Sequence, residues 1–268
     1  MATGEIVIED AGSVSWRSYY ELTKPKVVAL IVFTALVGML LASPSMVPWQ
    51  TLVFGLLGIG LAAAAGAVVN HVVDQRIDAL MDRTRGRPIP SHRMDTPHAL
   101  AFALGLTGLS MLILVALINP LTALLTFCAL IGYAVIYTMY LKRSTPQNIV
   151  WGGLAGAAPP LLGWTAVTGE VGVGGLLLLL IIFVWTPPHF WALAVRYRKD
   201  YDRAGVPMLP VVVGERRAME HMVAYTVALI GVTLLLYATG PVGWLYLSVA
   251  VAAGIGFFVG TWALRDHP

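Results

Sequence analysis

Eight long apolar runs, separated by short polar breaks, constrain the fold of this chain more than any other feature of its sequence. They cover approximately residues 26–43, 51–70, 98–118, 121–141, 149–168, 174–195, 218–239 and 242–263. A helix needs roughly 20 apolar residues to cross a bilayer. Only 12% of the residues are charged, whereas a soluble domain carries about 25%. The sequence therefore predicts an all-α, polytopic transmembrane bundle with eight spans. We expect a single domain over residues 1–268, with a flexible cytoplasmic N-terminus over residues 1–18.

The basic residues all fall on one side of this predicted bundle. None of the seventeen Lys and Arg residues lies in the four short turns, at Ser43-Pro44, Asn119-Pro120, Thr168-Gly169 and Gly240-Pro241. The positive-inside rule makes the opposite, basic face cytoplasmic. Thirteen of the fourteen acidic residues share that face. Two long connections on it, 71–97 and 196–217, concentrate both signs of charge, and we expect the chemistry there.

The first of these connections begins with an acidic row. Asn70, Asp74 and Asp78 are spaced four residues apart, so they share one face of a helix. Oxygen ligands of this kind suit a hard cation, and Mg²⁺ can bridge carboxylates to phosphates. The row is followed by three arginines, Arg83, Arg85 and Arg87. A metal beside arginines would stabilise the charge that grows on a departing diphosphate. The alternative is a solvated helix end with ordinary salt bridges; it is the weaker interpretation, because ionisable residues at a membrane boundary are usually functional.

The second connection follows a proline pair in the sixth apolar run. Pro187 and Pro188 are expected to kink or break this helix and to leave carbonyl groups that need partners, which suggests a cavity. His189 is then a buried neutral histidine bonded to such a carbonyl, a general base, or a contact to a bound heme. Asp200 and Asp202 are candidates for a second metal site, although an i, i+2 spacing does not share one face of a helix.

These motifs together resemble the UbiA-type intramembrane prenyltransferases. Asn70-x3-Asp74-x3-Asp78 matches the first acidic motif of that family. Other segments narrow the resemblance to its heme-farnesylating branch, the heme O synthases: 82–88, 137–149, 152–164, 186–191 and 200–210. The match extends from about Tyr19 to Gly214.

The resemblance implies an enzyme that transfers a farnesyl group from farnesyl diphosphate to a vinyl group of heme B, with addition of water, to form heme O. It implies that the acidic row, Asn70, Asp74 and Asp78, binds Mg²⁺ on the diphosphate and is catalytic. His189 is a further candidate, either as a catalytic residue or as a contact to heme. Four basic residues become candidate diphosphate contacts: Arg83, Arg87, Lys142 and Lys199.

The resemblance also carries expectations about the setting. It implies a bacterial inner-membrane enzyme, surrounded by membrane lipid, whose active site faces the cytoplasm. Heme A synthase or assembly proteins of a terminal oxidase are expected partners, and nucleic acid is not.

Two features depart from the family pattern. Relatives often carry a second motif with two acids four residues apart, whereas here Tyr197 and Tyr201 bracket Asp200, and Asp202 follows. The second metal site therefore stays open. The family also usually has nine spans, whereas eight apolar runs are visible here. We expect either a shortened form of the family or a missing last helix.

Three other functions compete with this interpretation. A secondary transporter would place its acids near the midplane, but here they cluster with arginines at one face. A related prenyltransferase would modify an aromatic acid, but the segments 186–191 and 201–210 favour heme. An assembly factor for an oxidase would not need the aligned acidic row.

Overall fold

The computed structural model describes residues 15–239 and 242–266, and all the elements in these ranges are helices. In chain order they are α1 (Trp16–Leu22), α2 (Pro25–Leu41), α3 (Trp49–Leu80), α4 (Thr96–Leu117), α5 (Pro120–Ile131), the π-helix η1 (Gly132–Leu141), α6 (Lys142–Ser144), α7 (Asn148–Ala157), α8 (Pro159–Thr168), α9 (Val173–Arg196), α10 (Arg198–Arg203), α11 (Leu209–Val213), α12 (Glu215–Thr239) and α13 (Trp244–Asp266). The predicted all-α bundle is confirmed. Of the N-terminus expected to be flexible, residues 1–14 lie outside the described ranges, and Trp16 to Ser18 begin α1.

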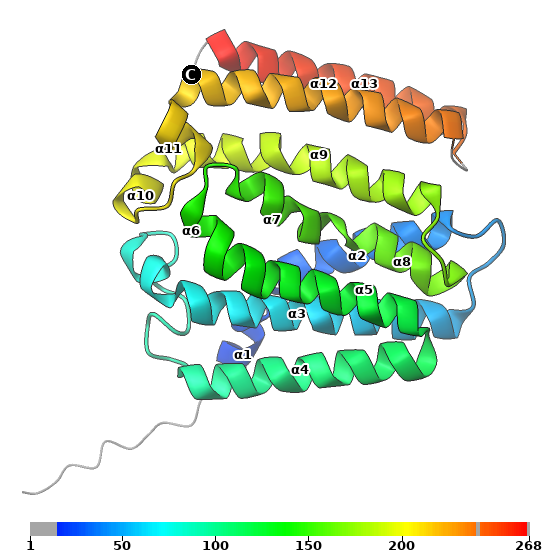
Figure 1. The fold of residues 1–268 in the computed structure, drawn as a ribbon, viewed down its shortest axis with the longest axis horizontal. Helices are drawn as coiled ribbons and strands as arrows, with labels where there is room; N and C mark the ends of the chain where they lie inside the picture. Colours follow the sequence, from blue (N-terminus) through cyan, green and yellow to red (C-terminus); the bar gives the residue numbers. More distant parts are fainter. Residues whose placement is uncertain (1–14, 240–241, 267–268) are drawn as a thin grey trace, which may run out of the picture.

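The long helices lie side by side and run back and forth along one direction (Figure 1). The principal neighbours are α3 with α4, α2 with α8, and α12 with both α9 and α13. The connection 81–95 and the short helices α6, α10 and α11 gather at one end of the bundle, and the turns that follow α2, α4 and α8 lie at the other (Figure 1). The two charged connections, far apart in the sequence, therefore meet at the same end of the bundle.

Among the described residues, fewer helices than the eight predicted spans have the length and the apolar character to cross a membrane. Six helices are long and apolar enough to cross a membrane, and α1 with α2, bent by 50°, would make a seventh. The predicted run 149–168 is divided between α7 and α8, which meet at Ala158. Pro159 and Pro160 follow this junction. Proline lacks the backbone N–H and clashes with the preceding turn, so it begins a new helix here.

The boundaries of the helices follow local chemistry. Asn119 accepts a hydrogen bond from the backbone N–H of Thr122 (2.8 Å) and so caps α5, with a proline in the first turn. Asp95 caps α4 in the same way by accepting from the backbone N–H of His98 (3.0 Å). This hydrogen bond holds the pKa of Asp95 below its ordinary value. Such caps satisfy backbone groups that a helix end leaves free.

The helices α2 and α8 cross with their backbones in close contact. A Cβ atom at Gly38 would lie 2.0 Å from the carbonyl oxygen of Pro160, and one at Gly163 would lie 2.0 Å from that of Ala35. Only glycine permits this approach, as is common where membrane helices pack on small residues. The crossing joins the start of the chain to its middle.

Two helices differ from their sequence-based expectation. Of the kink or break expected at Pro187 and Pro188, the break is wrong, because α9 continues from Val173 to Arg196; the kink stays a prediction. Packing against α7 and α12 supports α9 on two sides, and the Thr186 hydroxyl donates to the carbonyl of Ile182 (2.7 Å). The fourth predicted run also changes from α-helix to the π-helix η1. Such π segments are rare and occur often at functional sites.

Candidate active site

The acidic row lies at the end of α3, where the sequence placed it. With 32 residues, α3 is about 48 Å long at about 1.5 Å per residue, whereas the hydrocarbon core is about 30 Å thick. The row therefore falls near a membrane boundary. Asn70, Asp74 and Asp78 are 5%, 1% and 3% exposed. Two carboxylates are thus withdrawn from water, and each needs a positive partner there.

Three cationic side chains from three other segments supply these partners. Lys142, at the start of α6, donates from Nζ to Asp74 Oδ2 (2.5 Å). Arg87, in the connection after α3, donates from Nη1 to Asp78 Oδ2 (2.7 Å). Lys24, between α1 and α2, donates from Nζ to Asn70 Oδ1. Lys142 and Arg87 each pair with one carboxylate, and Lys24 adds a third basic side chain, a set of groups that suits an anionic ligand.

Asn70 connects the lysine and the carboxylate on either side of it. Its Oδ1 accepts from Lys24, and its Nδ2 donates to Asp74 Oδ2 (2.7 Å). Nδ2 also lies 3.5 Å from the hydroxyl oxygen of Thr138, in η1. An amide serves here because it accepts with one atom and donates with the other. Asn70 therefore holds Asp74 in one orientation.

The row offers oxygen ligands that fit Mg²⁺. Asp74 Oδ1 is buried and has no hydrogen-bond partner among the described residues. The same residues contain no group of three His, Cys, Asp or Glu side chains that could hold a metal ion. A Mg²⁺ site needs no such group, because this ion commonly uses one or two carboxylates together with waters and substrate phosphates. Asp74 and Asp78, with the Asn70 amide oxygen, match that requirement.

The second charged connection lies against the first. Arg83 is placed over the ring of Tyr197 (5.2 Å from its centroid) and reaches the hydroxyl oxygen of Tyr201 (3.5 Å). Arg203 pairs with Asp82 (3.7 Å). These contacts bring α10 to the end of α3, as required if both motifs serve one site.

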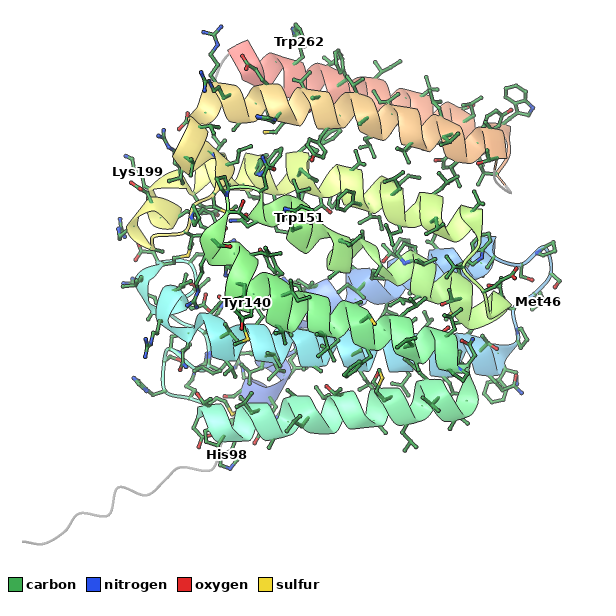
Figure 2. The ribbon with its side chains drawn as sticks, in the orientation of Figure 1. Met46, His98, Tyr140, Trp151, Lys199 and Trp262 are labelled. Carbon is green, nitrogen blue, oxygen red and sulfur yellow. The ribbon has the colours of Figure 1, made fainter. Side chains whose placement is uncertain are left out.

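The charged side chains of α10 itself are less enclosed. Asp200 is half-buried, whereas Asp202 and Lys199 are exposed, and Lys199 lies at the outer edge of the molecule (Figure 2). Within the described ranges, no hydrogen bond or ion pair joins these three residues to the acidic row. A second metal at Asp200 and Asp202 stays a prediction, as does contact between Lys199 and a diphosphate.

The arginines of the first connection are divided by the fold. Arg87 reaches the row, and Arg83 faces α10. Arg85 is exposed and pairs with Asp82 (3.4 Å). Asp82 does not continue the row, because α3 ends at Leu80 and the chain turns away at Met81.

His189 lies on a different surface from the row. Its exposed ring stacks on Trp185, with centroids 4.3 Å apart and planes at 16°. It borders an open groove of about 430 Å³ between α9, α12 and α13. The described residues show no hydrogen bond to this ring, so the predicted bond to a freed backbone carbonyl is not seen.

Comparison with known proteins gives the chain its family. The model of the UbiA prenyltransferase family matches residues 31–268. The chain belongs to the UbiA prenyltransferase family. Its resemblance to these enzymes, predicted from the motifs, is thereby confirmed. Long apolar helices and this membership make it an integral membrane protein.

Two curated relatives and one solved structure illustrate the likeness. The protoheme IX farnesyltransferase of Thioalkalivibrio sulfidiphilus is 60% identical over 268 residues, covering 100% of this chain and 89% of the relative. That of Alkalilimnicola ehrlichii is 62% identical over 252 residues, covering 92% and 83%. A UbiA homolog from Archaeoglobus fulgidus bound to DMAPP and Mg²⁺ has a TM-score of 0.73 at 16% identity, covering 94% of this chain and 88% of that one. At 16% identity, the similarity to the Archaeoglobus fulgidus structure concerns the fold alone.

Several members of the cluster were missed by reasoning from the sequence. Lys24 precedes the first span and Thr138 lies within the fourth, so both fall outside the two charged connections. Tyr133 and Tyr137 in η1 stack on each other (5.7 Å) and lie within electrostatic range of Asp74. One signal was available for Lys24, because a lysine directly before Pro25 begins a span at the basic face.

Proposed function

We propose that this UbiA-family protein transfers a farnesyl group from farnesyl diphosphate to a vinyl group of heme B, with addition of water, to form heme O. The observation that carries the proposal is 60% identity, over all 268 residues, to a protein named protoheme IX farnesyltransferase. The cluster at the end of α3 supports it, because buried carboxylates surrounded by cations suit an anion that arrives with a divalent metal.

The first part of the reaction is the departure of diphosphate. Asp74 and Asp78, oriented by Asn70, would hold Mg²⁺. When bound, Mg²⁺ would neutralise charge on the diphosphate. Lys142 and Arg87 already lie 2.5 and 2.7 Å from the carboxylates, so a small shift of each would let it share an oxygen of the ligand. Arg83, held over Tyr197, is available to the outer phosphate. These fixed cations stabilise the charge that grows as the C1–O bond breaks.

The second part joins the farnesyl group to the porphyrin. The broken C1–O bond leaves an allylic cation, and the electron pair stays with diphosphate. The terminal carbon of the vinyl group attacks C1, which forms a C–C bond and moves the positive charge to the inner vinyl carbon. Water adds there and loses a proton, giving the hydroxyethylfarnesyl side chain. The apolar helices exclude other water, so the first cation is not quenched.

The cellular setting follows from the same proposal. The cluster lies at the end of the bundle that carries the basic connections, and the positive-inside rule makes that end cytoplasmic. We therefore place the enzyme in the bacterial inner membrane with its site facing the cytoplasm. Heme A synthase or oxidase assembly proteins are proposed partners in that membrane. A second metal site at Asp200 and Asp202 is also part of the proposal.

Mass spectrometry of the heme product tests this function directly. Purified protein incubated with heme B, farnesyl diphosphate and Mg²⁺ should yield heme that is heavier by one farnesyl and one hydroxyl unit. Chelation of divalent cations with EDTA should abolish the product, and excess Mg²⁺ should restore it. Unmodified heme in all samples, with farnesylation of an aromatic acid instead, would assign the protein to another branch of the family.

His189→Ala should weaken the use of heme more than the use of farnesyl diphosphate. The residue lies in the groove of α9, α12 and α13 and outside the diphosphate cluster, so its loss should raise the apparent KM for heme by about 10-fold, the effect of about 1.4 kcal/mol. Steady-state rates with each substrate varied in turn measure this. Thr168→Ala, in α8 at the opposite end of the bundle, is the control. An unchanged KM for heme would remove His189 from the acceptor site.

A further inference from the structure

A second histidine, His71, lies in the charged cluster at the end of α3, and its ring has no hydrogen-bond partner among the described residues. It follows Asn70 on α3 and is only 3% exposed. Neither Nδ1 nor Nε2 has a partner among the described residues. A neutral imidazole has one donor and one acceptor, and a buried polar group without a hydrogen bond destabilises the fold. Buried polar groups of this kind call for a ligand or a functional explanation.

His71 shares the face of α3 that carries the carboxylates of the cluster. It precedes Asp74 by three residues and Asp78 by seven, a spacing that places all three on one face of a helix. It lies one turn deeper in the membrane than Asp74. Lys24 and Arg87 are close enough for their charges to act on its ring. The imidazole therefore lies beside the charged groups of the cluster.

We propose that His71 is a further catalytic residue, which donates a ring N–H hydrogen bond to an oxygen of the prenyl diphosphate. This inference rests on the proposed function, because it requires a prenyl diphosphate in the cluster. An anion among Lys24, Arg87 and Lys142 supplies the acceptor that the imidazole N–H lacks. The prenyl chain of this ligand would extend into the apolar bundle, so we expect the C1–O bond on the deeper side of the carboxylates, where His71 lies. A hydrogen bond there strengthens as negative charge moves onto the leaving group.

Binding of inorganic diphosphate in the presence of Mg²⁺ tests this inference without heme. His71→Leu keeps a similar volume but has no donor, whereas His71→Asn keeps an N–H donor. We expect the leucine variant to bind inorganic diphosphate about 10- to 100-fold more weakly, as for loss of a hydrogen bond to a charged group. The asparagine variant should stay within about 3-fold of the parent protein, since its N–H replaces the lost donor. Titration calorimetry in detergent measures both, and His98→Leu, at an exposed histidine of α4, is the control.

Turnover separates a role in the reaction from a role in packing. With farnesyl diphosphate, His71→Leu should lower kcat by about 10- to 100-fold, and His71→Asn should recover most of it. If His71→Leu does not fold, His71→Met replaces it as a donor-free variant. Wild-type diphosphate affinity in the donor-free variant would overturn the inference. Because this binding assay contains no heme, a protein that binds diphosphate through His71 but leaves heme unmodified would contradict only the proposed acceptor.

Discussion

Replacing Asp74 or Asp78 by asparagine should lower the rate of farnesyl transfer by at least about 10²- to 10³-fold, the usual effect of removing one charge-stabilising group from an active site. Asparagine keeps the shape of the side chain but removes the negative charge that would hold Mg²⁺. Asp74→Asn also leaves the partly buried ammonium of Lys142 without its counter-charge, so the melting temperature of this variant should fall as well. Product formation measured by liquid chromatography and mass spectrometry, over a series of Mg²⁺ concentrations, checks the result.

The matched control for these variants is Asp82→Asn. Asp82 follows the same helix but is exposed, and it pairs only with Arg85 and Arg203 among the described residues. Surface pairs of this kind contribute about 0–1 kcal/mol, so its activity should stay within about 3-fold of the parent protein. Full activity in Asp74→Asn or in Asp78→Asn would remove the metal-binding role of the row. Equal losses in all three variants would point to a general effect of charge at this end of the bundle.

Arg87→Gln should reduce kcat by about 10²-fold or more, with a smaller change in the KM for farnesyl diphosphate. Its guanidinium lies 2.7 Å from Asp78 and can grip phosphate oxygens in two places. The charge it stabilises grows as diphosphate departs, so its contribution is larger in the transition state than in the bound substrate. Loss of such an interaction lowers kcat and kcat/KM together. Initial rates over a range of farnesyl diphosphate concentrations separate the two constants.

Arg76→Gln is the matched control for Arg87→Gln. Arg76 is also an arginine at the end of α3, but it is exposed on the face away from the acidic row. Its replacement removes the same charge from the same region without touching the cluster. If both variants lost activity alike, the general positive field of this face would explain the effect. An Arg87→Gln variant with the parent kcat would exclude contact between Arg87 and the leaving group.

The positions of the acidic row could be predicted because they depend only on helix geometry. Asn70, Asp74 and Asp78 repeat every four residues, and any helix brings them onto one face. The helix boundaries at Asn119 and Asp95 are equally local, since each side chain caps a backbone N–H three residues away. The same holds for the membrane character of the chain, which follows from the length of its apolar runs.

The partners of the row could not be predicted, because they depend on how helices pack. Lys24 meets Asn70 across 46 positions of the sequence, and Lys142 meets Asp74 across 68. Basic residues are numerous at this face, and no spacing distinguishes Arg87, which reaches Asp78, from Arg85, which points into solvent. His71 was overlooked for the same reason, since its burial depends on neighbours from other segments.

The sequence by itself thus determined that the chain is a membrane-embedded helical bundle with one charged face and an acidic row at that face. These features arise from the hydrophobic effect and from the fixed periodicity of the helix, which act locally. Only the tertiary structure decided that α9 continues through its two prolines, that η1 is a π-helix, and which cation meets each carboxylate. Those outcomes depend on packing between distant helices, where the energy of a contact can outweigh a local preference.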